Sequence, residues 1–250
     1  MDFRKVYDTI PDEFDKWRTR YCDEAFSDII KYSELNENKS ALEIGPGTGQ
    51  ATEPILKTGC SYLAVELGQH LAEYTKNKFK AYDNFEIINA DFEKHDFGNR
   101  QFNLVFSAAT IQWIPEKIAF SKTYKLLKNG GTLAMMFTQT DEKKANEDLY
   151  SKIQMVYEKY FHPETEYTCR LDYTNAVNYG FVDFECHKYL QIREYNAEEY
   201  ISWIKTHAPN ITLKEPHKSE FYKGIREAIL SFDNRIELHD NIVLYMVRKP

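Results

Sequence analysis

Residues 43–50, which read EIGPGTGQ, decide the fold, because three glycines at alternate positions join an apolar run to an amphipathic one. The run 39–44 predicts a strand ending at Gly45, and residues 48–57 predict a helix that Pro54 must kink or shorten. Glycine suits a backbone that takes positive φ or lies against a ligand. The helix that follows directs its free N–H groups to the same place. The stretch therefore predicts a nucleotide-type site at the carboxyl edge of an open sheet.

The alternation of strands and helices continues to residue 137. Further strands are predicted over residues 62–65, 85–88, 102–106 and 132–137, with helices over 69–80 and 115–127. Strand, helix, strand at this spacing predicts crossover units and a parallel sheet.

The two flanks of this core differ from it. They predict helices over 11–34 and 141–160, late strands over 184–192 and 241–248, and two amphipathic stretches, 197–207 and 219–232. A helical insertion between the last two strands is expected to sit over the carboxyl edge as a lid.

Composition restricts the class of protein. The 250 residues carry a net charge of −7, with 42% hydrophobic and 28% charged residues, which suits one large globular domain or a domain with a cap. The acidic balance disfavours polyphosphate chains and anionic membranes as partners. No spanning helix and no signal peptide are visible, so a cytoplasmic location is expected. The widely spaced cysteines (22, 60, 169 and 186) predict free thiols, and no metal site is expected.

Acidic side chains follow the next two predicted strands. Glu66 ends the second strand, where a carboxylate can accept hydrogen bonds from ribose hydroxyls; a solvated charge is the alternative. Asp91 and Phe92 follow the third strand, where they can hold an adenine base; a helix N-cap is the alternative for Asp91. The dinucleotide fingerprint needs a glycine where Gln50 stands, so a nicotinamide oxidoreductase is disfavoured but left open.

The ordered segments ALEIGPGTGQ (41–50), AVELG (64–68), INADF (88–92), FNLVFSAATIQWI (102–114) and LLKNGGTLAM (126–135) resemble the class I S-adenosylmethionine-dependent methyltransferases, of the type that includes trans-aconitate methyltransferase-like enzymes. WRTRY (17–21) and LYMVRK (244–249) extend the resemblance more loosely. It implies a single domain with a Rossmann-like, seven-stranded, mostly parallel sheet whose last strand is antiparallel. The core would span 36–140, the N-terminal helices 1–35, and the lid insertions about 141–180 and 196–235.

The resemblance also implies S-adenosyl-L-methionine as cofactor and a set of residues that bind it. Those residues are Arg18, Tyr21, Glu43, Gly45, Gly47, Gly49, Glu66, Leu67, Asp91, Phe92, Ser107 and Ala108.

The acceptor side of the site is less defined. Many relatives carry His-Trp after the fourth strand where this chain has Gln112 and Trp113, and glutamine cannot act as a base near neutral pH. Further acceptor-pocket candidates are His162, Tyr167, Arg170, Tyr200 and His207.

We expect a small-molecule acceptor with an oxygen or nitrogen nucleophile, a carboxylate among the candidates, and a monomer or homodimer. RNA or protein acceptors and a non-catalytic cofactor-binding module stay open as alternatives.

Overall fold

The computed structural model describes residues 3–163 and 171–250, which fall into two compact units. The first, called here the sheet unit, comprises residues 19–138, 171–189 and 242–250. The second, the helical unit, comprises residues 3–18, 139–163 and 190–241.

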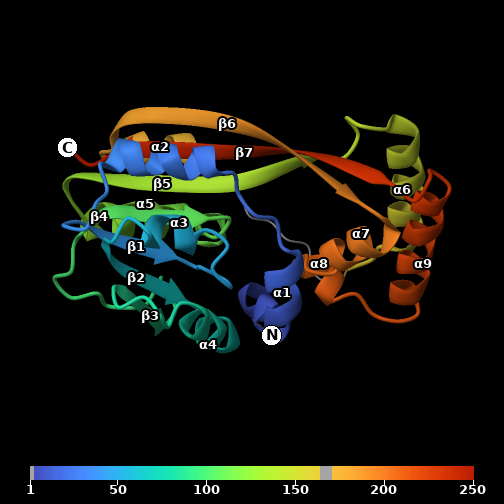
Figure 1. Cartoon of the computed structure of the whole chain (residues 1–250), viewed down its shortest axis with the longest axis horizontal. Helices are drawn as coiled ribbons and strands as arrows, with labels where there is room; N and C mark the ends of the chain where they lie inside the picture. Colours follow the sequence, from blue (N-terminus) through green and yellow to red (C-terminus); the bar gives the residue numbers. More distant parts are fainter. Residues whose placement is uncertain (1–2, 164–170) are drawn as a thin grey trace. The chain divides into compact units, whose positions relative to one another are not determined.

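A seven-stranded sheet runs through the sheet unit in the order β3-β2-β1-β4-β5-β7-β6 (Figure 1). Neighbouring strands from β3 to β5 are parallel, and β7 runs against its neighbours. This confirms the predicted sheet. The strands are β1 (Ser40–Ile44), β2 (Ser61–Glu66), β3 (Phe85–Asn89), β4 (Phe102–Ala108), β5 (Leu127–Asp141), β6 (Val182–Tyr195) and β7 (Ile236–Arg248).

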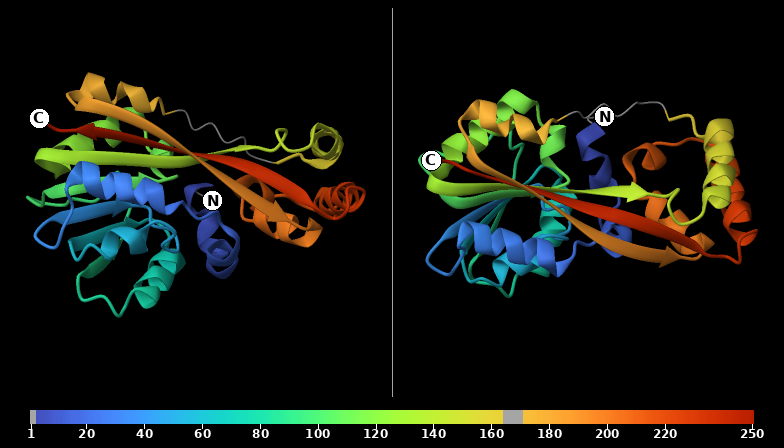
Figure 2. Two further views of the ribbon diagram at one scale, coloured as in Figure 1. Left: turned by 45° about the horizontal axis from the view of Figure 1, so that its top comes forward. Right: turned by 90° about the horizontal axis from the view of Figure 1, so that it is seen from above.

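Helices cover both faces of this sheet (Figure 2). Successive residues of β1 point to opposite faces, so Ala41 belongs to one core and Leu42 to the other. The first core contains apolar side chains of α2 (Asp23–Ser33) and α3 (Thr52–Leu56); the second contains those of α5 (Glu116–Leu126). Because β1 is buried on both faces from Ala41 onward, residues 41–44 are apolar without alternation except at Glu43.

Several element boundaries differ from prediction: the helix expected from residue 141 begins at Glu147, and the strand expected from residue 241 begins at Ile236. The helix expected over 48–57 is only α3, because residues 45–51 form a turn and Pro54 lies inside the short helix. The strand expected from Thr132 begins at Leu127, so Gly130 and Gly131 lie inside β5. There they exchange main-chain hydrogen bonds with Lys249 after β7, each 2.8 Å long. The two glycines therefore pair with a neighbouring segment instead of marking the end of a helix.

Several short helices were not predicted, and one of them bears on the expected lid. It is η3 (Tyr173–Tyr179), which lies in a stretch expected as part of the first lid insertion and packs on α5 in the sheet unit. Its Tyr179 hydroxyl donates to Glu116 at 3.2 Å. The placement of a lid over the carboxyl edge stays a prediction.

The helical unit has its own core. Apolar side chains of α6 (Glu147–Tyr160), α7 (Ala197–Ile204) and α9 (His217–Leu230) meet there, and η1 (Phe3–Thr9), α1 (Pro11–Trp17) and α8 (Ala208–Ile211) complete the unit. Gly224 lets α9 approach α6 closely, since a Cβ there would lie 2.8 Å from Val156. No helix within residues 3–163 and 171–250 has the length and apolar character needed to cross a membrane.

Candidate functional site

The glycine loop follows β1 at the carboxyl edge of the sheet. Gly45, Gly47 and Gly49 all take positive φ, at 66°, 60° and 85°, which explains why glycine stands at each. A Cβ on Gly45 would lie 2.3 Å from Thr110, and one on Gly49 would lie 2.4 Å from the Phe79 ring. These two glycines therefore also make room for the chain's own side chains, a packing role that sequence reasoning did not foresee.

Glu66 lies directly beside this loop. Its carboxylate accepts a hydrogen bond from the Gly47 amide at 3.0 Å and another from the Gly68 amide at 2.9 Å. The side chain thus joins the end of β2 to the glycine loop and to the start of α4 (Gln69–Lys78). The structure brings together two of the residues expected to bind cofactor. Leu67, between Glu66 and Gly68, accepts from Asn89 through its carbonyl at 3.2 Å.

Glu43, the acid of the decisive stretch, is fully buried in the sheet. It accepts hydrogen bonds from the hydroxyls of Thr52 at 2.6 Å and Tyr62 at 2.5 Å. Burial raises the pKa of this carboxyl to about 7, although both hydroxyls favour the ionised form. The hydrogen bonds of Glu43 therefore connect β1 to α3 and to β2 inside the core.

The segment after β3 forms a tight turn. Asp91 accepts from the Glu93 amide at 3.0 Å, and its carbonyl accepts from the amides of Lys94 and His95. The Phe92 ring is buried against Phe97, with the Lys122 ammonium 5.1 Å from its centre. Turn formation and core packing account for these contacts, and adenine binding by the two residues stays a prediction.

The end of β4 carries Ser107 and Ala108. The buried Ser107 hydroxyl donates to the Ile44 carbonyl at 3.2 Å and accepts from the Ile111 amide at 2.9 Å. Ala109, which directly follows β4, has a φ of 55°, an uncommon value for a residue with a side chain. This turn delivers Thr110, whose hydroxyl donates to the Gly45 carbonyl at 3.0 Å.

Gln112 and Trp113 lie in η2 (Ile111–Trp113), immediately after this turn. The Tyr173 hydroxyl of η3 donates to the Gln112 side-chain oxygen at 3.4 Å. The Tyr173 ring in turn stacks on Phe137 and on Tyr245, with centres 5.0 Å apart in each pair. Gln112 is thus held at the border of an aromatic stack, and its amide offers donors and acceptors but no base.

Other candidates lie in the helical unit. Tyr200 is buried, donates to Glu142 at 3.4 Å and packs on Trp203, which also contacts His207 with ring centres 4.5 Å apart. Burial drives the pKa of His207 well below its usual range, so this imidazole is neutral.

The remaining predicted residues have varied surroundings. Arg18 lies over the Tyr7 and Phe14 rings in the helical unit, and His162 lies against His217 there. Tyr21 packs edge-on against Phe26 in the sheet unit. Tyr167 and Arg170 lie outside the described residues.

Sequence reasoning missed the support that α4 gives to the loop. The Thr75 hydroxyl donates to the Gly47 carbonyl at 2.6 Å, and the Lys78 ammonium donates to the Thr48 carbonyl at 3.0 Å. Threonine and lysine three residues apart share one helix face. In the sequence, this polar pair beside the apolar residues of the helix was the feature that could have indicated a contact between α4 and the loop.

Comparison of sequences shows what this chain is similar to. Residues 42–135 match a family model described as a methyltransferase domain. A curated relative, the rRNA adenine N-6-methyltransferase of Limosilactobacillus reuteri, is 26% identical over 239 residues and aligns with 88% of this chain and 89% of its own length. The chain spans about half or less of the length of the next curated relatives, which are named ribosomal RNA small subunit methyltransferase A.

Comparison of structures supports the fold. The YcgJ protein of Bacillus subtilis is 13% identical and superposes with a TM-score of 0.61, over 92% of this chain and all of its own. Phosphoethanolamine N-methyltransferase 2 of Haemonchus contortus, solved with S-adenosylhomocysteine, is 16% identical with a TM-score of 0.59, over all of this chain and 60% of its own.

Proposed function

Because this chain is a class I S-adenosylmethionine-dependent methyltransferase, we propose that it transfers a methyl group to an oxygen or nitrogen atom of a small-molecule acceptor. The net charge of −7 is the observation that favours a small-molecule acceptor over a polyanion such as RNA. A protein of this charge repels a polyanion at long range, whereas a small molecule has only to match the local surface of a pocket.

The described residues fit the cofactor at the carboxyl edge of β1, β2 and β4. A Glu66 carboxylate oxygen lies 3.0 Å from the Gly47 amide nitrogen, so the carboxylate and the main chain of the glycine loop lie side by side. An ionised carboxylate accepts several hydrogen bonds at once, which suits ribose hydroxyls. When bound, S-adenosylmethionine supplies a methyl group on a positively charged sulfur. We assign the ribose to Glu66 and the amino-acid end to the segment around Ser107 and Ala108.

The chain's own contribution is to position the acceptor and exclude water. Gln112, held by Tyr173, can orient a carboxylate, amide or hydroxyl but cannot remove a proton. A carboxylate acceptor needs no base, so Gln112 favours an acceptor that is already nucleophilic. Trp113, Tyr200, His207 and Arg170 remain proposals for the acceptor pocket.

Calorimetric titration with S-adenosylhomocysteine tests the cofactor assignment. Binding is expected for the native chain, and Glu66→Gln should weaken it about tenfold or more, since a charge-assisted hydrogen bond contributes roughly 1.5–3 kcal/mol. Glu73→Gln on the exposed side of α4 is the matched control and should bind like the native chain. Equal affinity of the two variants for S-adenosylhomocysteine would contradict the assignment of the ribose to Glu66.

Turnover tests the acceptor. The native chain is incubated with S-adenosylmethionine and pools of small carboxylates, amines and alcohols, and S-adenosylhomocysteine is measured. One pool should release it above the rate without acceptor. Cofactor binding without turnover on any pool would support a non-catalytic cofactor-binding module instead.

The names of the curated relatives favour a second candidate, methylation of RNA. Titration of total RNA at increasing salt separates the two proposals. Phosphate contacts would give binding that weakens steeply as salt rises, and a small-molecule enzyme should show no such binding at physiological salt. RNA-dependent release of S-adenosylhomocysteine would establish the second candidate.

A further inference from the structure

We propose that two copies of this chain associate through β6, the edge strand of the sheet, with the two strands antiparallel and centred on His187. Within the described sheet, β6 has a neighbouring strand, β7, on one side only. An unpaired strand edge is a template for another strand unless it is short, charged or covered. β6 is one of the longest strands of the chain, so this edge is extensive.

The side chains of β6 are unusually apolar for an exposed edge. Phe184 is 37% exposed, Leu190 56% and Ile192 51%, and Val182 is exposed as well. Among the described residues, more large apolar side chains are exposed on this strand than on all other elements together. Such a concentration of apolar surface indicates a contact surface rather than scattered exposure.

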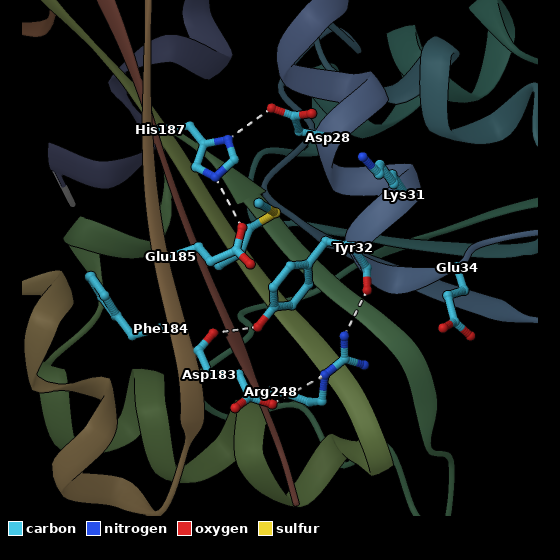
Figure 3. Close-up of a pocket in the computed structure, with 10 residues that line it drawn as sticks. Asp28, Lys31, Tyr32, Glu34, Asp183, Phe184, Glu185, His187 and Arg248 are labelled. Atoms are coloured by element: carbon cyan, nitrogen blue, oxygen red, sulfur yellow. Dashed lines mark hydrogen bonds and ion pairs between the residues drawn. The ribbon is translucent and has the colours of Figure 1, made fainter.

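Phe184, Cys186, Lys188, Leu190 and Ile192 share one face of β6, because alternate residues of a strand point the same way. We call these five residues the apolar row. In Figure 3, Phe184 lies on one side of the strand while Glu185 and His187 lie on the other. Val182 is left out, since Asp183 has a φ of 53° and interrupts the alternation there.

The row is self-complementary in one antiparallel register. With His187 opposite His187 of the second copy, Phe184 lies opposite Leu190 and Cys186 lies opposite Lys188, each twice by symmetry. Aromatic and aliphatic side chains directly opposite one another stabilise such a pair of strands. An interface that repeats the same patch on both copies is the usual kind in homodimers, which favours a second copy over an unrelated partner.

Charge favours the register centred on His187 over the neighbouring register. A shift that centres the pair on Lys188 places two lysines opposite each other, and Lys188 has no ion-pair partner among the described residues. His187, by contrast, lies between Asp28 at 2.8 Å and Glu185 at 3.0 Å (Figure 3). When the His187 imidazole is protonated, these two carboxylates balance its charge within its own chain. They line a pocket of about 600 Å³ between α2 and the ends of β6 and β7.

Sedimentation equilibrium of the native chain tests the association. A dimer is expected in the micromolar range, and Leu190→Lys should shift it to monomer by placing charge opposite Phe184 of the second copy. Met155→Lys is the matched control, because Met155 is similarly exposed, at 60%, but lies on α6; this variant should stay dimeric. A native chain that stays monomeric at high concentration, or loss of the dimer in both variants, would overturn the proposal.

A crosslink tests the register without disturbing the apolar contacts. Lys188→Cys places a thiol opposite Cys186 of the second copy, and mild oxidation should convert the two thiols into a disulfide that links the copies. The same substitution with Cys186→Ser should give little crosslinked dimer. Equal crosslinking of both forms would reject the register centred on His187. If Leu190→Lys fails to fold, this readout still decides the proposal.

Discussion

Glu43 shows how one residue can serve the site from inside the core. It precedes the glycine loop in the sequence, yet its carboxylate is enclosed and held by Thr52 and Tyr62. Desolvation disfavours the charged form and raises the pKa from 4.5 to about 7. The protonation state of this one carboxyl is therefore coupled to folding.

Glu43→Gln should remove a pH dependence of stability. Between pH 4.5 and about 7, the folded chain holds a proton that the unfolded chain has lost, so the free energy of unfolding falls as pH rises. The variant, neutral at every pH, should match the native chain near pH 4 and exceed it at pH 8 by up to about 3 kcal/mol. Urea unfolding measured across this range checks it.

Thr52→Val is the companion variant for this experiment. It removes a hydrogen bond that lowers the pKa of Glu43, so the midpoint of the native pH dependence should move upward. A native stability curve that is flat between pH 4.5 and 8 would contradict the assignment.

At the scale of elements, the glycine loop is enclosed by its neighbours. The turn after β4 supplies Thr110 against Gly45, and the end of α4 supplies Phe79 against Gly49. The loop is thus shaped by contacts from elements far along the chain as well as by its own backbone preferences. Positive φ explains glycine at each position, and close approach adds a second reason at two of them.

Gly49→Ala should therefore destabilise the chain more than Gly98→Ala. Both glycines have positive φ, and a side chain in that conformation costs roughly 1–2 kcal/mol. A Cβ at position 98 meets nothing within 4 Å, whereas one at position 49 would lie 2.4 Å from Phe79, so overpacking adds about 1–3 kcal/mol. Urea unfolding of the two variants measures the difference. Equal losses would show that Phe79 yields freely.

At the scale of the whole molecule, three strands continue beyond the sheet unit. β5, β6 and β7 each have residues in both units. In the helical unit, fully buried Asp240 of β7 accepts from Arg193 of β6 at 2.5 and 3.0 Å and from Thr140 of β5 at 2.6 Å. One carboxylate thus joins the far ends of all three strands.

Asp240→Asn should destabilise the chain by about 3–5 kcal/mol, because it leaves the guanidinium of Arg193 largely buried without its counter-charge. Arg193→Met combined with Asp240→Asn should lose less than the sum of the single losses. Glu198→Gln, which breaks the exposed pair with Arg226, is the control and should cost about 1 kcal/mol or less. Chemical denaturation measures the Asp240→Asn and Arg193→Met single variants, the double variant and the control; additive losses in the double variant would argue against coupling.

The sequence by itself determined the sheet and its nucleotide-type loop. Buried parallel strands appear as short apolar runs, and glycines at positive φ have few substitutes, so β1 to β4 and the loop at residues 45–49 could be predicted from local pattern. Glu66 beside Gly47 also followed, since the carboxyl ends of parallel strands meet at one edge.

Only the tertiary structure decided which side chains enclose the loop and what the acids contact. Thr75, Lys78, Phe79 and Thr110 reach the loop from other elements, and no local pattern records a contact between residues so far apart. The start of β5 likewise depends on pairing with the chain after β7, which overrides the tendency of Gly130 and Gly131 to follow a helix. Long-range pairing and packing are properties of the folded chain, because their partners meet only when the whole sheet has formed.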